Sequence, residues 1–193
     1  MELSENHKAD REIIPSAYLG MVMYLFTEIM FFSALLSAYI VGKAGAMVPW
    51  PPEGQPRLPI TATFVNTLVL LSSSLTLFIA YKSIESISKT KKFLIATITL
   101  GSLFLLIQGY EWIELIGFGM TSTSNLFAGF FYTIVGMHGL HVFFGVLGLN
   151  FALYRYSKNP LDASSKISVK TIGIYWFFVV YLWPFIYYLL YLY

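Results

Sequence analysis

The chain has 193 residues, of which 57% are hydrophobic and only 11% charged, whereas soluble domains carry about 25% charged residues. The net charge of +2 gives no sign of nucleic-acid binding, and the absence of cysteine excludes disulfides, thiolate metal sites and cysteine nucleophiles. Several apolar runs of about 20 residues or more are long enough to cross a bilayer. The composition therefore predicts an integral membrane protein.

The chain divides into a short polar start and one membrane domain. Residues 1–15, MELSENHKADREIIP, mix acidic and basic side chains and lack the apolar core of a signal peptide. We expect them to form a soluble tail. Residues 16–193 are expected to form an all-α bundle of five transmembrane helices. The apolar runs place these helices near 16–41, 62–81, 93–116, 126–154 and 171–193.

The basic residues predict the orientation of these helices. Lys43 and Arg57 fall between the first two spans, whereas the other ten Lys and Arg lie in the tail and in the loops at 82–92 and 155–170. Loops rich in Lys and Arg stay on the cytoplasmic side of a membrane. We therefore expect a multi-pass protein of the plasma membrane of a prokaryote, with its N-terminus inside and its C-terminus outside.

The first span carries a glutamate and a row of small residues. Glu28, in LFTEIMFF, lies about midway along the span, where a charge costs at least ~2.5 kcal/mol. We expect a neutral acid hydrogen-bonded within the bundle, with proton handling or lipid contact as the alternative roles. The small side chains allow close helix approach, and packing inside the bundle is favoured over a subunit contact. They are Ser33, Ala34, Ser37 and Ala38.

Polar residues recur in the second and third spans. Glu111 and Glu114, in QGYEWIEL, lie near the end of the third span, and Glu114 is close enough to reach the interface. Glu111 is set deeper, beside Gln108 and Tyr110. Because Asn66 begins the second span at a similar depth, we expect Glu111 and Asn66 to share one polar cluster.

Two histidines lie inside the fourth span, in IVGMHGLHVFFG. The i, i+3 spacing of His138 and His141 puts them on one helix face near mid-membrane, where they offer a partner for Glu28. They could serve as metal ligands, as a proton relay or as a hydrogen-bonding pair. Ferritin-like metal sites place Glu-x-x-His on each of two helices, a pattern that this chain lacks. In the last span, Pro184 predicts a kink.

Several segments together resemble subunit III of the haem-copper terminal oxidases. The first span resembles the family's helix that carries a glutamate followed by paired aromatics, and the next three resemble its Asn-Thr, Gln-x-Tyr-Glu and His-Gly-Leu-His helices. The matching segments are YLGMVMYLFTEIMFFSALLSAYI, FVNTLVLLSSSLTLFIA, LLIQGYEWIEL and GFFYTIVGMHGLHVFFGVLGL. The fifth span departs from the family, because Phe177 and Val180 stand where it usually has His and Asp.

The resemblance implies an accessory, non-redox role in aerobic respiration. Such subunits pack against catalytic subunit I and other oxidase subunits, stabilise the catalytic subunit and support proton uptake. Haem and copper are then expected in the partner catalytic subunit, and this chain is expected to bind no cofactor. Contact with phospholipids of the membrane is also expected. The chain's three histidines are too few for the catalytic haem and copper ligands. The positions carried over are Glu28, Asn66, Glu111, His138 and His141. With this role, the two histidines are expected to be a hydrogen-bonding pair near mid-membrane.

Three other functions remain open from the sequence. A similar accessory protein accompanies some nitric oxide reductases. A small proton or solute transporter could be built around Glu28 and the two histidines. A factor that assists assembly and then leaves the mature enzyme is the third.

Overall fold

Five long helices make up the described part of the chain. The computed structural model describes residues 16–47 and 49–193, so the expected tail at 1–15 lies outside the described residues. All five helices are long and apolar enough to cross a membrane, which confirms the predicted all-α fold and its five spans. They are α2 (Ser16–Ala44), α3 (Ile60–Lys82), α4 (Ile87–Gly117), α5 (Leu126–Lys158) and α6 (Ala163–Tyr187), followed by a π-helical segment, η1 (Tyr188–Leu192).

Three helix ends extend beyond the predicted apolar runs. α4 begins at Ile87, α5 ends at Lys158 and α6 begins at Ala163, each several residues outside the expected bounds. At the start of α6, Asp162 caps the helix, because its carboxylate accepts a hydrogen bond from the Ser165 backbone N–H at 3.1 Å. Hydropathy marks only the part of a helix that lies in hydrocarbon, whereas polar caps and basic turns continue the helix into the interface.

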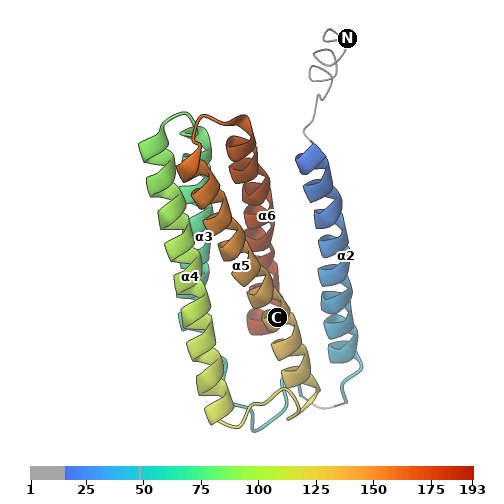
Figure 1. The fold of residues 1–193 in the computed structure, drawn as a ribbon. Coiled ribbons are helices and arrows are strands. Elements are labelled where there is room, and N and C mark those ends of the chain that lie inside the picture. Colours follow the sequence, from blue (N-terminus) through green and yellow to red (C-terminus); the bar gives the residue numbers. More distant parts are fainter. Residues whose placement is uncertain (1–15, 48) are drawn as a thin grey trace.

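Four of the helices form a bundle, and the first stands to one side of it. Figure 1 shows α3, α4, α5 and α6 packed together, with α2 beside α5 and α6. Within α2 only Phe32 and Tyr39 are buried. Four further apolar side chains of this helix are partly buried and pack against the core: Met21, Leu25, Leu35 and Leu36. At the far end, Lys43 Nζ donates a hydrogen bond to the carbonyl oxygen of Tyr193 and lies 3.7 Å from the centre of its ring.

The small residues of α2 do not pack inside the bundle. All four of them are exposed along the outer side of the helix. The expectation of packing inside the bundle is therefore wrong. α2 contacts the bundle through Phe32 and Tyr39, and the four small residues lie off this contact face. The exposed small residues are Ser33, Ala34, Ser37 and Ala38.

A buried tryptophan of α6 contacts three other helices at the centre of the bundle. Trp176 of α6 has no exposed surface, and its ring lies against Gly101 of α4 and Gly145 of α5. A Cβ atom on Gly145 would lie 2.8 Å from Trp176 Cε3, and one on Gly101 would collide with the same ring. The indole N–H donates to Ser73 Oγ of α3 at 3.1 Å. The glycines thus make room for the ring, and the serine satisfies its single polar atom.

The end of α6 changes its helical geometry. Pro184 lies inside the helix, and π-helical structure begins at Tyr188, four residues later. Proline removes one backbone donor from the helical ladder. The kink at Pro184 remains a prediction.

Candidate functional site

Glu28 is paired with one of the two predicted histidines. Its carboxyl Oε2, on α2, lies 2.9 Å from Nε2 of His141 on α5. The two residues are 113 positions apart in the chain, and both lie near the middle of their helices. This contact joins the peripheral helix to the bundle through a polar interaction at mid-membrane depth.

The geometry of the pair fixes how many protons it holds. His141 Nδ1 lies 2.6 Å from the carbonyl oxygen of Met137, and a carbonyl oxygen only accepts, so Nδ1 carries a hydrogen. The contact between Nε2 and Glu28 Oε2 then requires one more proton. That proton sits either on an imidazolium facing a carboxylate or on a neutral carboxyl facing a neutral imidazole. In both arrangements the pair has no net charge, which lowers the cost of keeping it in hydrocarbon.

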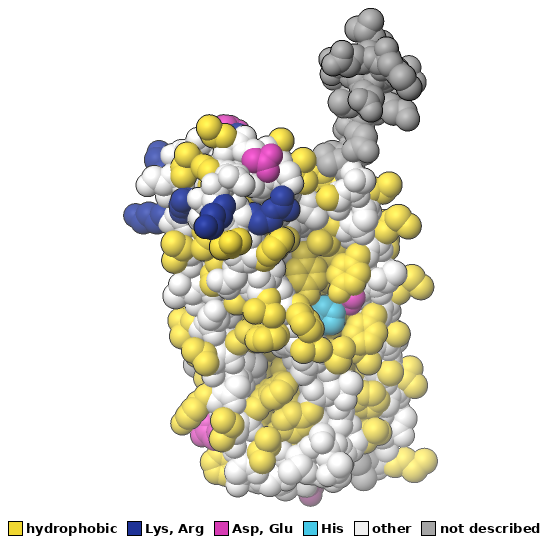
Figure 2. All heavy atoms as spheres, in the orientation of Figure 1, with side chains coloured by type: hydrophobic (Ala, Val, Ile, Leu, Met, Phe, Trp, Pro, Cys, Tyr) yellow, Lys and Arg dark blue, Asp and Glu magenta, His cyan; other side chains and the backbone are white. Residues whose placement is uncertain are grey.

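The pair lies in an aromatic setting at the edge of the bundle. Phe32 meets the His141 ring edge-on at 5.1 Å between ring centres, and the hydroxyl of Tyr175 donates to the His141 carbonyl at 3.0 Å. The side chains of Glu28 and His141 remain 14% and 11% exposed. Figure 2 shows a histidine with an adjacent acidic side chain about halfway along an apolar wall. Of the two histidines, His138 has no exposed surface. The pair of Glu28 and His141 is therefore the one that is partly accessible from the membrane.

His138 occupies a different environment from His141. Its ring stacks on Trp183, with centres 4.8 Å apart and planes at 28°, and lies edge-on to Phe104 at 6.1 Å. Neither ring nitrogen has a hydrogen-bond partner among the described residues. The structure does not support the expected hydrogen-bonding pair on one face. Residues three apart differ by about 60° around a helix, so His141 faces α2 while His138 faces α4 and α6.

Glu111 forms a second buried polar cluster. Its Oε2 accepts hydrogen bonds from Thr63 Oγ1 of α3 and from Gln108 Nε2 of α4, both at 3.0 Å. The predicted partnership with Asn66 is not formed, because the Asn66 amide donates instead to the carbonyl oxygen of Phe104 at 3.2 Å. Asn66 lies about one turn further along α3 than Thr63. The expected depth was therefore close, but the rotation of α3 presents threonine to the carboxyl.

The polar face of α3 is the functional feature that sequence reasoning missed. Its buried polar residues lie at 63, at 66 and 67, and at 73 and 74, with the buried Leu70 between the last two groups, which is the spacing of one helix face. This face makes hydrogen bonds with Glu111 and Trp176. In addition, Thr67 Oγ1 accepts a hydrogen bond from the indole N–H of Trp183 at 2.9 Å. The signal was present in the sequence as a polar stripe. Its members are Thr63, Asn66, Thr67, Ser73 and Ser74.

The polar side chains do not gather into a larger ligand set. Among residues 16–47 and 49–193, no group of three or more His, Asp or Glu side chains lies close enough to hold a metal ion. Glu28 and His141 supply two potential ligand atoms, and Nδ1 of His141 is already engaged with Met137. The contact between His141 Nε2 and Glu28 Oε2 accommodates one proton.

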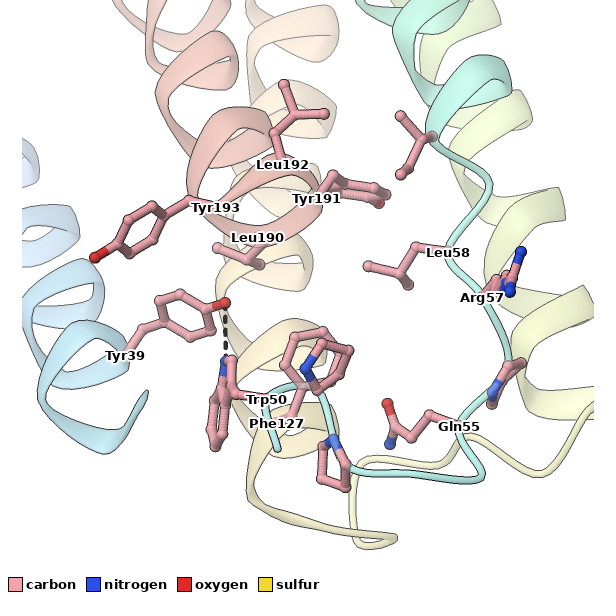
Figure 3. A pocket seen from close by; sticks show the side chains of 14 residues that line it. Tyr39, Trp50, Gln55, Arg57, Leu58, Phe127, Leu190, Tyr191, Leu192 and Tyr193 are labelled. Carbon is pink, nitrogen blue, oxygen red and sulfur yellow. Dashed lines mark hydrogen bonds between the residues drawn. The ribbon is translucent and has the colours of Figure 1, made fainter. Parts of the chain in front are cut away.

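A cavity at one end of the bundle lies apart from these residues. It has a volume of about 350 Å³ and lies among the end of α2, the segment at 50–60, the start of α5 and the chain's last residues. Figure 3 shows Gln55 reaching toward Trp50 and Phe127, while Arg57 lies at the edge. The indole N–H of Trp50 donates to the Tyr39 hydroxyl at 3.2 Å. None of the five predicted site residues lines this cavity.

Comparison with known proteins identifies the family. Residues 5–193 match the family described as cytochrome c oxidase subunit III. The chain belongs to this family. Cytochrome c oxidase subunit 3 of Synechocystis sp. is 36% identical over 180 residues, covering 90% of this chain and 74% of the relative. The same subunit of Thermostichus vulcanus is 35% identical over 179 residues, covering 90% and 86%. That of the insect Aedes aegypti is 30% identical over 175 residues, covering 87% and 66%.

The last helix departs from the family's usual pattern at Phe177 and Val180. Val180 is fully buried, and Phe177 stacks on Tyr181 with ring centres 6.2 Å apart. Both positions are thus apolar in this member, where the resemblance leads one to expect His and Asp. Glu28 finds its partner on α5 instead of α6. The pairing of Glu28 therefore does not depend on the two polar side chains that this member lacks.

The different environments of the two histidines predict changes in stability of different size when each is replaced by leucine. His141→Leu should lower the free energy of unfolding by about 1–3 kcal/mol, because it leaves Glu28 without a partner inside the membrane. His138→Leu should change it by less than about 1.5 kcal/mol, because a side chain of similar size replaces two unpartnered nitrogens. Thermal unfolding of the two variants in the same detergent measures the difference. An equal loss of stability in both would contradict this assignment.

Proposed function

We propose that this chain is an accessory, non-redox subunit of a haem-copper cytochrome c oxidase and packs against catalytic subunit I. The observation that carries the proposal is the family match over nearly the whole chain, with relatives named cytochrome c oxidase subunit 3 in several bacteria. The enzyme would oxidise cytochrome c and reduce oxygen to water in its catalytic subunit. This membership disfavours both the nitric oxide reductase and the transporter alternatives.

The ligand inventory supports placing the redox chemistry in the partner. The chain has three histidines and no cysteine, which is fewer than haem and copper ligation in the catalytic subunit requires. In addition, His141 is committed to Glu28 and Met137, and His138 is enclosed by aromatic rings. Haem and copper are therefore assigned to subunit I.

The Glu28 and His141 pair supplies the proton-handling part of the proposal. It holds one mobile proton between two atoms 2.9 Å apart and is partly open to the membrane side of α2 and α5. Uptake of a second proton would leave the hydrogen bond between Glu28 and His141 in place, whereas release of the shared proton would break it. The pair would support proton uptake by the neighbouring subunit and stabilise the contact between them, with phospholipid as a second neighbour.

The orientation and location follow from the basic residues. The loop between α3 and α4 and the loop between α5 and α6 lie at the same end of the bundle (Figure 1), where Figure 2 shows the Lys and Arg side chains gathered. Basic loops stay on the cytoplasmic side, so the N-terminus would lie inside and the C-terminus outside. Because bacterial relatives are 36% and 35% identical to this chain, we propose the plasma membrane of a prokaryote.

Gentle purification from native membranes tests the accessory role. The chain should co-migrate with a larger, haem-bearing subunit that oxidises cytochrome c. Once separated from that subunit, it should show no haem absorption and retain no stoichiometric copper. Size-exclusion chromatography with absorption spectra and metal analysis makes the measurement. Migration of the chain by itself, without any haem protein, would refute the proposal.

Replacing Glu28 by Gln tests whether this residue only assists proton supply or takes part directly in oxygen reduction. Glu28→Gln retains a side chain of the same size but removes the carboxyl proton, so it should slow proton supply while leaving the redox centres intact. We expect the oxygen reduction rate of the assembled complex to fall by less than about tenfold, which corresponds to about 1.4 kcal/mol in the barrier. An oxygen electrode measures this rate, and haem content controls for assembly. Loss of all activity in a fully assembled complex would show a direct role in the reaction.

The cysteine-free chain allows a direct test of orientation. Ser88 and Thr123 are both exposed and lie at opposite ends of the bundle, so single cysteines there report on opposite sides of the membrane. In intact cells, a membrane-impermeant maleimide should label Thr123→Cys and not Ser88→Cys. After permeabilisation both should react. The reverse pattern in intact cells would invert the orientation.

A further inference from the structure

A shallow hollow lies along the seam between α3 and α6. It has a volume of about 270 Å³. One of its walls is formed by the rings of Phe177 and Tyr181, which are nearly parallel, with planes at 13° and centres 6.2 Å apart. Tyr181 stands about midway between Lys170 and Tyr193 in the sequence, so the hollow opens near mid-membrane. The residues that line it are Ser74, Leu75, Phe78, Phe177 and Tyr181.

Contacts on either side of the hollow close this seam. At the end of the basic loops, Nζ of Lys170 on α6 lies 5.5 Å from the centre of the Tyr81 ring on α3. At the opposite end, the Tyr187 hydroxyl donates to the carbonyl oxygen of Ile60 at 3.1 Å. Between these points, α6 is hydrogen-bonded to α3 through Trp176. The hollow is therefore a local depression in a closed seam and does not continue to the membrane surface.

Tyr181 brings an exposed hydroxyl to this apolar face. The residue is 54% exposed, although tyrosine ordinarily lies at the membrane interface. Of the residues that line the hollow with it, only Ser74 is polar, and the Ser74 hydroxyl donates to the Leu71 carbonyl of its own helix at 2.7 Å. A serine can satisfy itself in this way, but a phenol is too long to reach its own backbone. Because acyl chains offer no acceptor, the Tyr181 hydroxyl requires one from a neighbouring protein.

The shape of the hollow favours a side chain from a different transmembrane helix. Helices in a membrane associate by close packing and by hydrogen bonds between them, and a side chain of one helix can fill a gap on the other. An acyl chain would follow a groove that continues to the headgroups, which this hollow does not. A two-fold contact between copies of this chain would use the same patch on both. Two hollows would then face each other and stay empty.

We propose that the seam between α3 and α6 is the docking face for a transmembrane helix of the catalytic subunit. One side chain of that helix fills the hollow, and an oxygen atom beside it accepts a hydrogen bond from Tyr181. This inference rests on the proposed function, because it takes the neighbouring helix from the subunit that holds the redox centres. It adds the face of contact, which lies on a different seam from the Glu28 and His141 pair.

Photo-crosslinking in native membranes tests the docking face. The photoreactive residue p-benzoylphenylalanine replaces either Leu75, which lines the hollow and is 61% exposed, or Leu106 on α4, which is 72% exposed. After illumination, the complex is purified through a tag on this chain, and the crosslinked product is identified by mass spectrometry. The variant at Leu75 should crosslink to a transmembrane segment of the haem-bearing subunit. The variant at Leu106 should not crosslink to that subunit.

The possible results separate the docking face from the proposed function. The chain could purify with the haem-bearing subunit while the variant at Leu75 crosslinks only to lipid, to a second copy of this chain or to another subunit. The docking face would then be wrong, and the proposed function would stand. A crosslink to the haem-bearing subunit that is as strong from Leu106 as from Leu75 would also overturn the docking face. If the chain does not purify with a haem-bearing subunit, the proposed function fails and the docking face fails with it.

Removing the Tyr181 hydroxyl tests the hydrogen bond to the partner. Tyr181→Phe retains the ring, and it should speed the release of this chain from the purified complex in detergent by about two- to tenfold, as expected for one hydrogen bond. Tyr110→Phe is the matched control, because Tyr110 is 67% exposed but lies on α4, and it should leave the release rate unchanged. Size-exclusion chromatography at fixed times measures release, and circular dichroism confirms that both variants fold. Equal release rates in the two variants would overturn the proposal.

Discussion

A polar atom inside a membrane has to find its partner within the protein, because lipid supplies none. This constraint acts most strongly on α2, where only two side chains are buried. The contact between Glu28 and His141 therefore adds a polar tie to the apolar contacts that α2 makes through Phe32 and Tyr39. It also fixes the rotation of the helix, since Glu28 can face α5 in only one orientation. The small residues of α2 consequently lie on the outer side.

The same constraint explains how the rest of the bundle is built. Each of the large indole rings of α6 carries one donor, and each donor meets a hydroxyl of α3, at Ser73 and at Thr67. The carboxyl of Glu111 meets Thr63 on the same face. The polar face of α3 thus holds α4 and α6 through hydrogen bonds. Glycines on α4 and α5 then allow the Trp176 ring to fit between the helices.

These features suit a subunit that assists a redox enzyme without holding its cofactors. Under the proposed function, the internal hydrogen bonds of the bundle would help it to support a neighbouring subunit through repeated turnover. The partly exposed pair of Glu28 and His141 lies between α2 and α5.

The sequence by itself determined the number of spans, the family and the need of Glu28 for a partner, because hydropathy and charge cost depend on local composition. It could not choose between His138 and His141, which share a face to within about 60°. Only the tertiary structure decided that choice, together with the pairing of Glu111 with Thr63 in place of Asn66 and the outward position of Ser33 and Ala34. Partner selection depends on how far each helix is rotated and tilted against its neighbours. That rotation is set by the packing of all five helices at once. The sequence of one helix therefore does not determine it.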